Sequence, residues 1–180
     1  MVLAAKLEDS LEAVRLSPSD AGLVELIVRR PSEGEREVLD VAELDLDAGL
    51  VGDRWRASAA ADGEPLDTST QVTLMNARLI ALIEPDRQRW PLAGDQLYVD
   101  LDLSPGNLPA GAQLELGSAV IEVTEAPHTG CAKFTARFGS DATRLVNSRE
   151  GRALRLRGMN ARVIGPGQVR VGDPIFKRPL

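Results

Sequence analysis

The strongest constraint on the fold is the alternation of apolar and polar residues over 96–103. Leu97, Val99, Leu101 and Leu103 fall on one side of an extended chain, and the residues between them are polar or aromatic. A period of two is typical of a strand with one buried face. Further strand patterns occur at 23–28, 38–46, 71–75, 114–116, 119–123, 161–164 and 169–171. We therefore expect a mainly β protein built from short strands.

Turn residues separate these strands closely. Gly117-Ser118 and Gly165-Pro166-Gly167 predict hairpins, and Gly94-Asp95 reads as an ordinary turn. Helical spacing appears over 3–16, after a possible Asn76 cap, and over 141–146. Many short strands with few short helices favour a β-barrel or a β-sandwich.

Composition excludes several classes of protein. The 180 residues are 43% apolar and 27% charged, which suits one domain with its own core. Aromatic residues make up only 3%, and the formal net charge is −6, so we expect no nucleic-acid partner. No apolar run approaches the roughly 20 residues of a membrane span. One cysteine permits no internal disulfide, and we expect a soluble cytoplasmic protein with no membrane partner.

The residues that could carry chemistry gather in 120–158. The sole histidine, His128, and the sole cysteine, Cys131, follow a strand pattern that breaks at Pro127. Between 128 and 157 there are seven basic residues and two acidic ones. Neighbouring cations stabilise a thiolate, so Cys131 could be a reactive thiol. The plainer interpretation is that Cys131 simply packs in the interior, as free cysteines often do.

Two other uses of Cys131 receive less support. A cysteine hydrolase needs a histidine base directed at the sulfur, and its familiar arrangement draws that histidine from far along the chain. A structural zinc site prefers several cysteine or histidine ligands. The basic residues are more informative, because arginine forks bind phosphate well. Arg155 and Arg157 would share one face of an extended segment, and Gly139-Ser140 could open a helix that adds N–H donors to an anion.

Several motifs in order resemble one known family. They are Thr-Gly-Cys-x-Lys-Phe at 129–134, Arg-Phe-Gly at 137–139, Arg-Gly-x-x-Ala-Arg-Val at 157–163 and Gly-x-Val-x-Val-Gly-Asp at 167–173. Val-Gly-Asp-Arg at 51–54, Gln-Val-Thr-Leu at 71–74 and Gly-Asp-Gln-Leu at 94–97 add to the pattern. Together they resemble the MOSC domain, found at the C-terminus of molybdenum-cofactor sulfurases and as stand-alone bacterial proteins. The likeness divides the chain into an N-terminal helical extension (1–19), a MOSC β-barrel domain (20–176) and a tail (177–180).

The resemblance implies a β-barrel with a few short peripheral helices that binds molybdenum cofactor, an anionic pterin. Cys131 would carry sulfur or contact molybdenum, and the arginines of 152–157 would face the cofactor's phosphate. Full sulfurases make activated sulfur in a pyridoxal-phosphate desulfurase domain, which these residues lack. A separate desulfurase would therefore supply the sulfur, and a molybdoenzyme would accept it. The expected cofactor-binding residues are His128, Thr129, Lys133, Arg152, Arg155, Arg157, Asp53 and Arg54.

Two alternatives remain open. The chain could be a non-catalytic barrel that binds a small anionic ligand, with Cys131 as a structural residue. It could also use Cys131 to conjugate or detoxify a small electrophile, without any need for molybdenum.

Overall fold

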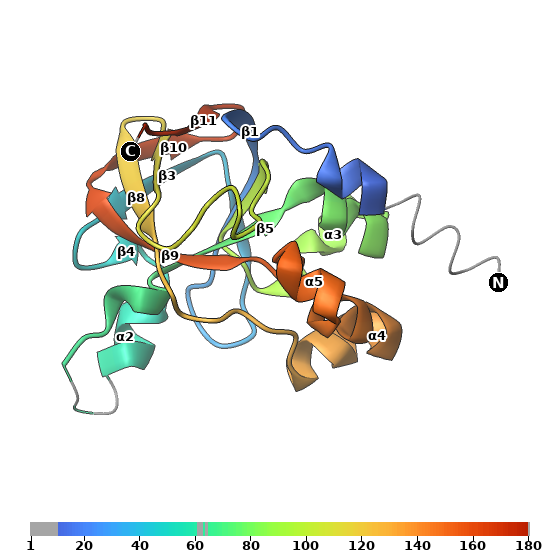
Figure 1. The fold of residues 1–180 in the computed structure, drawn as a ribbon. Coiled ribbons are helices and arrows are strands. Elements are labelled where there is room, and N and C mark those ends of the chain that lie inside the picture. The colour runs from blue at the N-terminus through green and yellow to red at the C-terminus, as the bar shows by residue number, and fades with distance from the viewer. Residues whose placement is uncertain (1–10, 61–62, 64, 180) are drawn as a thin grey trace, which may run out of the picture.

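A computed structural model describes residues 11–60, 63 and 65–179. Within these residues, seven strands close into a mixed barrel in the order β11-β7-β8-β9-β5-β6-β1, and β11 pairs with β1 to complete the ring (Figure 1). Neighbours are antiparallel except for the parallel pair β5 and β6. The strands are β1 (Ala21–Arg29), β5 (Val72–Asn76), β6 (Leu97–Asp100), β7 (Gln113–Leu116), β8 (Ala119–Val123), β9 (Met159–Gly165) and β11 (Pro174–Lys177). The expected β-barrel is confirmed.

Four short strands lie outside the ring. Strand β2 (Glu37–Leu39) extends the barrel sheet beyond β1. Strands β10 (Gly167–Arg170), β3 (Val41–Asp45) and β4 (Gly49–Leu50) form a separate small sheet. The predicted turn at 117–118 joins β7 to β8 as a hairpin. The hairpin predicted at 165–167 is wrong, because β9 and β10 follow each other there but pair in different sheets.

The alternating segment 96–103 is buried on its apolar face throughout, and its other face is buried at Gln96 and Tyr98 and half-buried at Asp100 and Asp102. The expectation of one solvated face is therefore wrong for the first part of the segment. Leu97, Val99, Leu101 and Leu103 fill the aliphatic barrel interior as expected. Tyr98, on the opposite face, is also fully buried. It belongs to a second core outside the barrel, where its hydroxyl donates to the Trp90 carbonyl at 2.8 Å. Helices cover this face, which a local pattern does not reveal.

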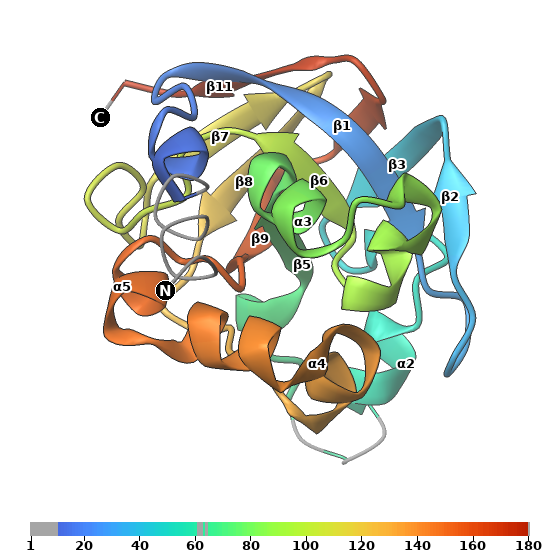
Figure 2. The same ribbon diagram turned by 90° about the vertical axis from the view of Figure 1, so that its right-hand side faces the viewer.

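The helices are short and peripheral. They are α2 (Trp55–Ala60), α3 (Ala77–Ile83), α4 (Ala132–Asn147), α5 (Arg149–Ala153) and the 3₁₀ turns η1 (Thr68–Thr70) and η2 (Arg87–Ala93). Helices α3, α4 and α5 lie on one side of the barrel (Figures 1 and 2). The Asn76 side chain caps α3 as predicted, accepting from the backbone of Arg78 and Leu79.

Helix α4 is longer than the predicted helix at 141–146. It begins directly after Cys131 and is kinked at Gly139, which adopts a left-handed φ of 88°. Of the predicted N-terminal helix over 3–16, residues 11–15 are helical, and Leu11 and Val14 are buried in the second core. The remainder, 1–10, lies outside the described residues. None of the helices described here combines the length and apolar character needed to cross a membrane.

Candidate functional site

The loop that carries His128 and Cys131 leaves β8 and enters α4, and its conformation is fixed by Asn147 at the far end of that helix. The Gly130 N–H donates to Asn147 Oδ1 at 2.9 Å, and Asn147 Nδ2 donates to the Gly130 carbonyl at 3.0 Å. A Cβ atom at position 130 would come within 3.0 Å of Val146. Glycine therefore lets the loop lie against the helix, and the paired hydrogen bonds hold Cys131 in place.

Cys131 is exposed, so the interpretation as a buried packing residue is wrong. It occupies the N-cap position of α4. The backbone N–H of Phe134 makes the largest contribution and lowers the pKa of the Cys131 thiol. Burial opposes it as the next contribution, and the Lys133 N–H and the Arg157 charge bring the net shift down. The Cys131 side chain makes no capping hydrogen bond to the helix, so these N–H groups act on the sulfur as partial positive charges. The surroundings favour the thiolate.

A buried carboxylate, Asp95, links the two basic residues beside this loop. Asp95 is fully buried and accepts from Arg157 Nη1 at 2.6 Å. Its other oxygen lies 2.7 Å from His128 Nε2. Burial alone would raise the pKa of Asp95, but the adjacent Arg157 and His128 outweigh burial and lower it. Asp95 is therefore ionised at neutral pH.

The ionised carboxylate also fixes the histidine. Because Asp95 can only accept hydrogen bonds, His128 Nε2 carries a proton in this contact. A neutral His128 ring then presents Nδ1 as its accepting nitrogen. Asp95 is thus a positioning residue that the sequence reasoning missed, since Gly94-Asp95 looked like an ordinary turn. The available signal was its place directly before the most regular strand pattern in the chain.

Arg157 is a buried structural cation rather than a freely accessible phosphate ligand. Its Nη2 donates to the Ala93 carbonyl at 2.8 Å, and the guanidinium lies 4.9 Å from the centre of the Phe134 ring. Its Nε is buried without a hydrogen-bond partner among the described residues. The guanidinium therefore keeps one unsatisfied donor beside the thiol loop.

The expected extended segment around Arg155 and Arg157 is wrong. Residues 149–153 form α5, and turns follow up to β9, with Arg155 at a left-handed φ of 48°. Ser148 starts the helix by accepting from the Gly151 N–H at 2.9 Å. A Cβ at Gly151 would lie 2.2 Å from the Leu145 carbonyl oxygen, so glycine permits α5 to pack against α4. These local preferences outweigh the extended pattern.

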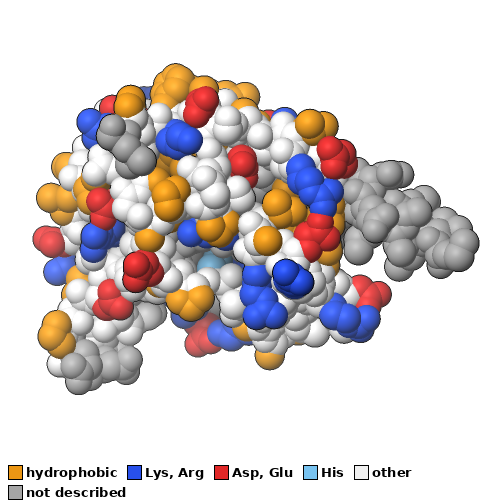
Figure 3. Space-filling model, in the orientation of Figure 1, with side chains coloured by type: hydrophobic (Ala, Val, Ile, Leu, Met, Phe, Trp, Pro, Cys, Tyr) orange, Lys and Arg blue, Asp and Glu red, His pale blue; other side chains and the backbone are white. Residues whose placement is uncertain are grey.

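The structure nevertheless brings five predicted site residues to one cavity of about 240 Å³, which we call the histidine cavity. Its wall includes Gly151, Gly158, Met159 and the loop from Thr124, and the predicted residues in it are His128, Thr129, Arg152, Arg155 and Arg157. Figure 3 shows the pale blue of histidine within a hollow, with basic side chains gathered beside it.

The arginines of this cavity differ in their freedom to bind a ligand. Arg155 Nη1 donates to the carbonyls of Leu103 and Leu108, at 3.2 and 2.5 Å. Burial lowers the pKa of Arg155. Arg152, by contrast, is exposed at the cavity wall. Arg152 is thus the arginine best placed to receive an anion.

The predicted pair Asp53 and Arg54 is split by the structure. The Asp53 side chain is buried, with Arg30 Nη2 at 2.8 Å from one carboxylate oxygen and Arg30 Nε at 2.9 Å from the other. Burial opposes ionisation, but Arg30 outweighs it and lowers the pKa of Asp53. Asp53 also accepts from the Trp55 N–H at 2.9 Å, so it fixes the start of α2.

Arg54 and the remaining predicted residue, Lys133, meet in a second cavity of about 340 Å³. We call it the basic cavity, and its lining residues are Glu33, Gly34, Arg36, Arg54, Lys133, Ala136 and Arg137. Lys133 and Ala136 belong to the first half of α4, directly after Cys131, and Cys131 itself is in the lining of neither cavity.

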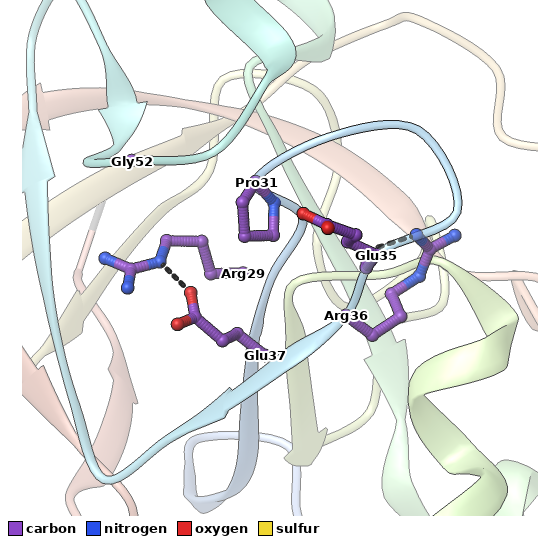
Figure 4. A pocket seen from close by; sticks show the side chains of 6 residues that line it. All are labelled: Arg29, Pro31, Glu35, Arg36, Glu37 and Gly52. Carbon is purple, nitrogen blue, oxygen red and sulfur yellow. Dashed lines mark hydrogen bonds and ion pairs between the residues drawn. The ribbon is translucent and has the colours of Figure 1, made fainter.

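A wider, open hollow of about 740 Å³ adjoins the basic cavity at Arg36 and contains none of the predicted residues. Figure 4 shows Arg29 and Glu37 directed at each other across it, with Arg29 Nε 2.7 Å from the carboxylate. Its basic and acidic side chains largely offset each other, and it offers no nucleophile. Size alone therefore does not make this hollow the functional site.

A family profile described as the MOSC domain matches residues 81–176, which is just over half of the chain. The protein belongs to the MOSC domain family, as the resemblance of its motifs predicts. A comparison with curated protein sequences gives no significant match.

Solved bacterial structures share the fold. YiiM from Escherichia coli has 22% sequence identity and a TM-score of 0.58, with coverage of 88% of this chain and 70% of that one. The YuaD protein from Bacillus subtilis has 19% identity and a TM-score of 0.56, over 86% and 94% of the two chains. YiiM from Geobacillus stearothermophilus has 13% identity and a TM-score of 0.54, over 89% and 74%. At these identities the likeness establishes the fold alone.

Proposed function

We propose that this MOSC protein binds molybdenum cofactor, or a closely related phosphate-bearing pterin, on the face that presents Cys131. The observation that carries the proposal is an exposed thiol of lowered pKa that lies two residues after Thr129 and three after His128, which line a cavity with Arg152, Arg155 and Arg157. The chain as a whole has a net charge of −6, so this concentration of cations is local.

The donor groups suit such a ligand. A thiolate is a soft ligand appropriate to a transition metal, and a guanidinium fork suits phosphate. Cys131 would contact the metal, Arg152 would bind the phosphate, and the unsatisfied Arg157 Nε would support an acceptor atom nearby. No group of three or more metal-ligating side chains occurs in the described residues, so Cys131 would be the principal protein ligand to a metal that arrives with its cofactor. A bound molybdenum centre would supply two-electron redox chemistry.

His128 and Thr129 would orient the ligand. The Asp95 contact at Nε2 fixes the His128 ring and leaves Nδ1 outside that contact, and Thr129 offers a hydroxyl on the same cavity wall. Neither residue needs to transfer a proton for binding. Their role in this proposal is to fix the position of the pterin relative to the Cys131 sulfur.

Sulfur delivery would follow from the same thiolate. Cys131 would attack the terminal sulfur of a persulfide on a donor desulfurase, a new S–S bond would form at Cys131, and the donor cysteine would leave as a thiolate. Two thiols of a small-molecule reductant would then cleave this S–S bond and become a disulfide, which returns Cys131 to the thiol and releases the outer sulfur as hydrogen sulfide for a molybdoenzyme. Both partners are part of the proposal.

The test is anaerobic incubation with molybdenum cofactor released from a molybdoenzyme, followed by desalting and measurement of retained molybdenum by mass spectrometry. The protein should retain about one equivalent. Cys131→Ser and Arg152→Gln should each lose most of it, while Arg144→Gln should not, because Arg144 is an exposed cation in the second half of α4 that lines neither cationic cavity.

Two results would contradict the proposal. Failure of the unmodified protein to retain molybdenum would remove its basis. Retention by Cys131→Ser equal to that of the unmodified protein would instead support a non-catalytic anion-binding barrel. Formation of a covalent adduct with a small electrophile in the absence of molybdenum would favour a conjugating or detoxifying thiol.

A further inference from the structure

The basic cavity joins four cations from three separate parts of the chain. Arg36 directly precedes β2, Arg54 directly precedes α2, and Lys133 and Arg137 lie in the first half of α4. The one acidic residue in its lining is Glu33, whose side chain is 77% exposed and lies 3.3 Å from Lys133. The formal charge of the lining is therefore close to +3.

Two of these guanidinium groups are held in position by neutral partners. Arg36 Nε donates to the Pro91 carbonyl at 3.1 Å, and its Nη1 donates to the Glu35 carbonyl at 2.7 Å. Arg137 Nη1 donates to the Leu92 carbonyl at 2.7 Å. Backbone carbonyls orient a guanidinium without cancelling its charge. The cations are thus positioned in advance, and their remaining donors are available to a ligand.

The cations also oppose one another. Burial makes the largest contribution to lowering the pKa of Arg36, and the charge of Arg137 is the next contribution. Arg30 and Arg54 lower it further. Where several cations lie close together in a partly buried site with few carboxylates, a bound anion reduces the repulsion between them.

We propose that the basic cavity is a second anion-binding site, specific for the phosphate group of a small molecule. A phosphate carries more than one negative charge and three acceptor oxygens, which matches several guanidinium forks and a lysine better than a single carboxylate does. The volume of about 340 Å³ accommodates a phosphate or diphosphate rather than a polymer. The site shares no lining residue with the histidine cavity, so it stands apart from the proposed cofactor function.

An anion in this cavity would also act on the thiol. Lys133 is two residues beyond Cys131, and one turn of an α-helix rises about 5.4 Å. A phosphate held by Lys133 would oppose the thiolate electrostatically and raise the pKa of Cys131. Occupancy of the cavity would therefore reduce the alkylation rate of Cys131 at neutral pH.

The experiment is calorimetric titration with inorganic pyrophosphate at constant ionic strength. Arg54→Gln and Lys133→Gln should each weaken binding by roughly ten-fold, because each removes a charged hydrogen-bond donor. Glu33→Gln should strengthen binding by about two- to five-fold, because it removes the acid from the lining. Arg144→Gln, which removes an exposed cation from the same helix, should bind as the unmodified protein does.

The outcomes separate this site from the thiol chemistry. Cys131→Ala should bind pyrophosphate at least as tightly as the unmodified protein, because it removes a thiolate that opposes the anion. The site can therefore hold even if the cofactor proposal fails. No binding by the unmodified protein at millimolar pyrophosphate would overturn the inference. The inference would also be overturned if Arg152→Gln lost pyrophosphate binding while Arg54→Gln kept it, because the anion would then occupy the histidine cavity. The higher pyrophosphate affinity expected for Glu33→Gln cannot arise from misfolding. A lower affinity in this variant would also overturn the inference.

Discussion

Replacing Asp95 by asparagine should lower the free energy of unfolding by about 3–5 kcal/mol at neutral pH. The Asp95 side chain is fully buried, and its partner Arg157 is 7% exposed. Removing the carboxylate charge leaves a buried guanidinium without its counterion, at a contact of 2.6 Å. Breaking a buried ion pair from one side is costly for this reason, whereas removing both partners costs much less.

The pH dependence has a defined sign. The pKa of Asp95 is lowered in the folded protein, so the stability it contributes is present above the unfolded-state pKa of about 3.9. That contribution is lost as the pH falls from there through the folded-state value. The difference between the unmodified protein and Asp95→Asn should therefore narrow below about pH 4.

The assay is urea unfolding followed by circular dichroism at pH 7 and pH 3. The matched control is Asp141→Asn, which breaks an exposed pair with Arg144 and should change stability by less than about 1 kcal/mol. The double variant Asp95→Asn with Arg157→Met should regain part of the loss, because it removes the unpaired charge. The reasoning is refuted if Asp95→Asn costs no more than Asp141→Asn, or if the loss persists unchanged at pH 3.

Other expectations follow from single contacts. Gly158→Ala should lower stability by at least about 2 kcal/mol, because position 158 has a φ of 111° and a Cβ there would lie 2.2 Å from the Leu74 carbonyl oxygen. Gly106→Ala, where a Cβ meets nothing within 4 Å, should change it by no more than about 0.5 kcal/mol, and equal melting temperatures for the two variants would contradict this. Asn147→Ala removes both hydrogen bonds to Gly130 and should lower stability by about 1–3 kcal/mol. Asn147→Ala should also raise the apparent pKa of Cys131 measured by alkylation. An unchanged value would show that the hydrogen bonds between Asn147 and Gly130 do not affect the Cys131 pKa.

The sequence predicted the barrel strands well because their signal is local. Alternation placed Leu97 and Val99 in the interior, and Gly117-Ser118 located the β7–β8 hairpin. Gly165-Pro166-Gly167 instead marks the passage from one sheet to the other. Closure of the ring was not predictable from such patterns, since it depends on pairing of residues 21–23 with 174–176. The burial of Tyr98 depends likewise on a second core that a single strand does not encode.

The candidate site shows the same division. Cys131 and His128 stood out because each is the sole residue of its kind. Asp95 did not, because its partners lie 33 and 62 residues further along the chain. Arg155 and Arg157 were assigned to an extended segment, although a Ser148 cap and close packing at Gly151 produce a helix and turns. The cluster around Arg36 was missed for the reason that applies to Asp95, since folding brings its members together from separate segments.

The most direct test of the account is the pH dependence of Cys131 alkylation in the folded protein, followed by intact mass. A single cysteine makes the reading unambiguous. The account predicts labelling without denaturant, with an apparent pKa below the ordinary value of about 8.5. An apparent pKa at or above 8.5, or no labelling until the protein is unfolded, would contradict the claim that this loop presents an activated thiolate.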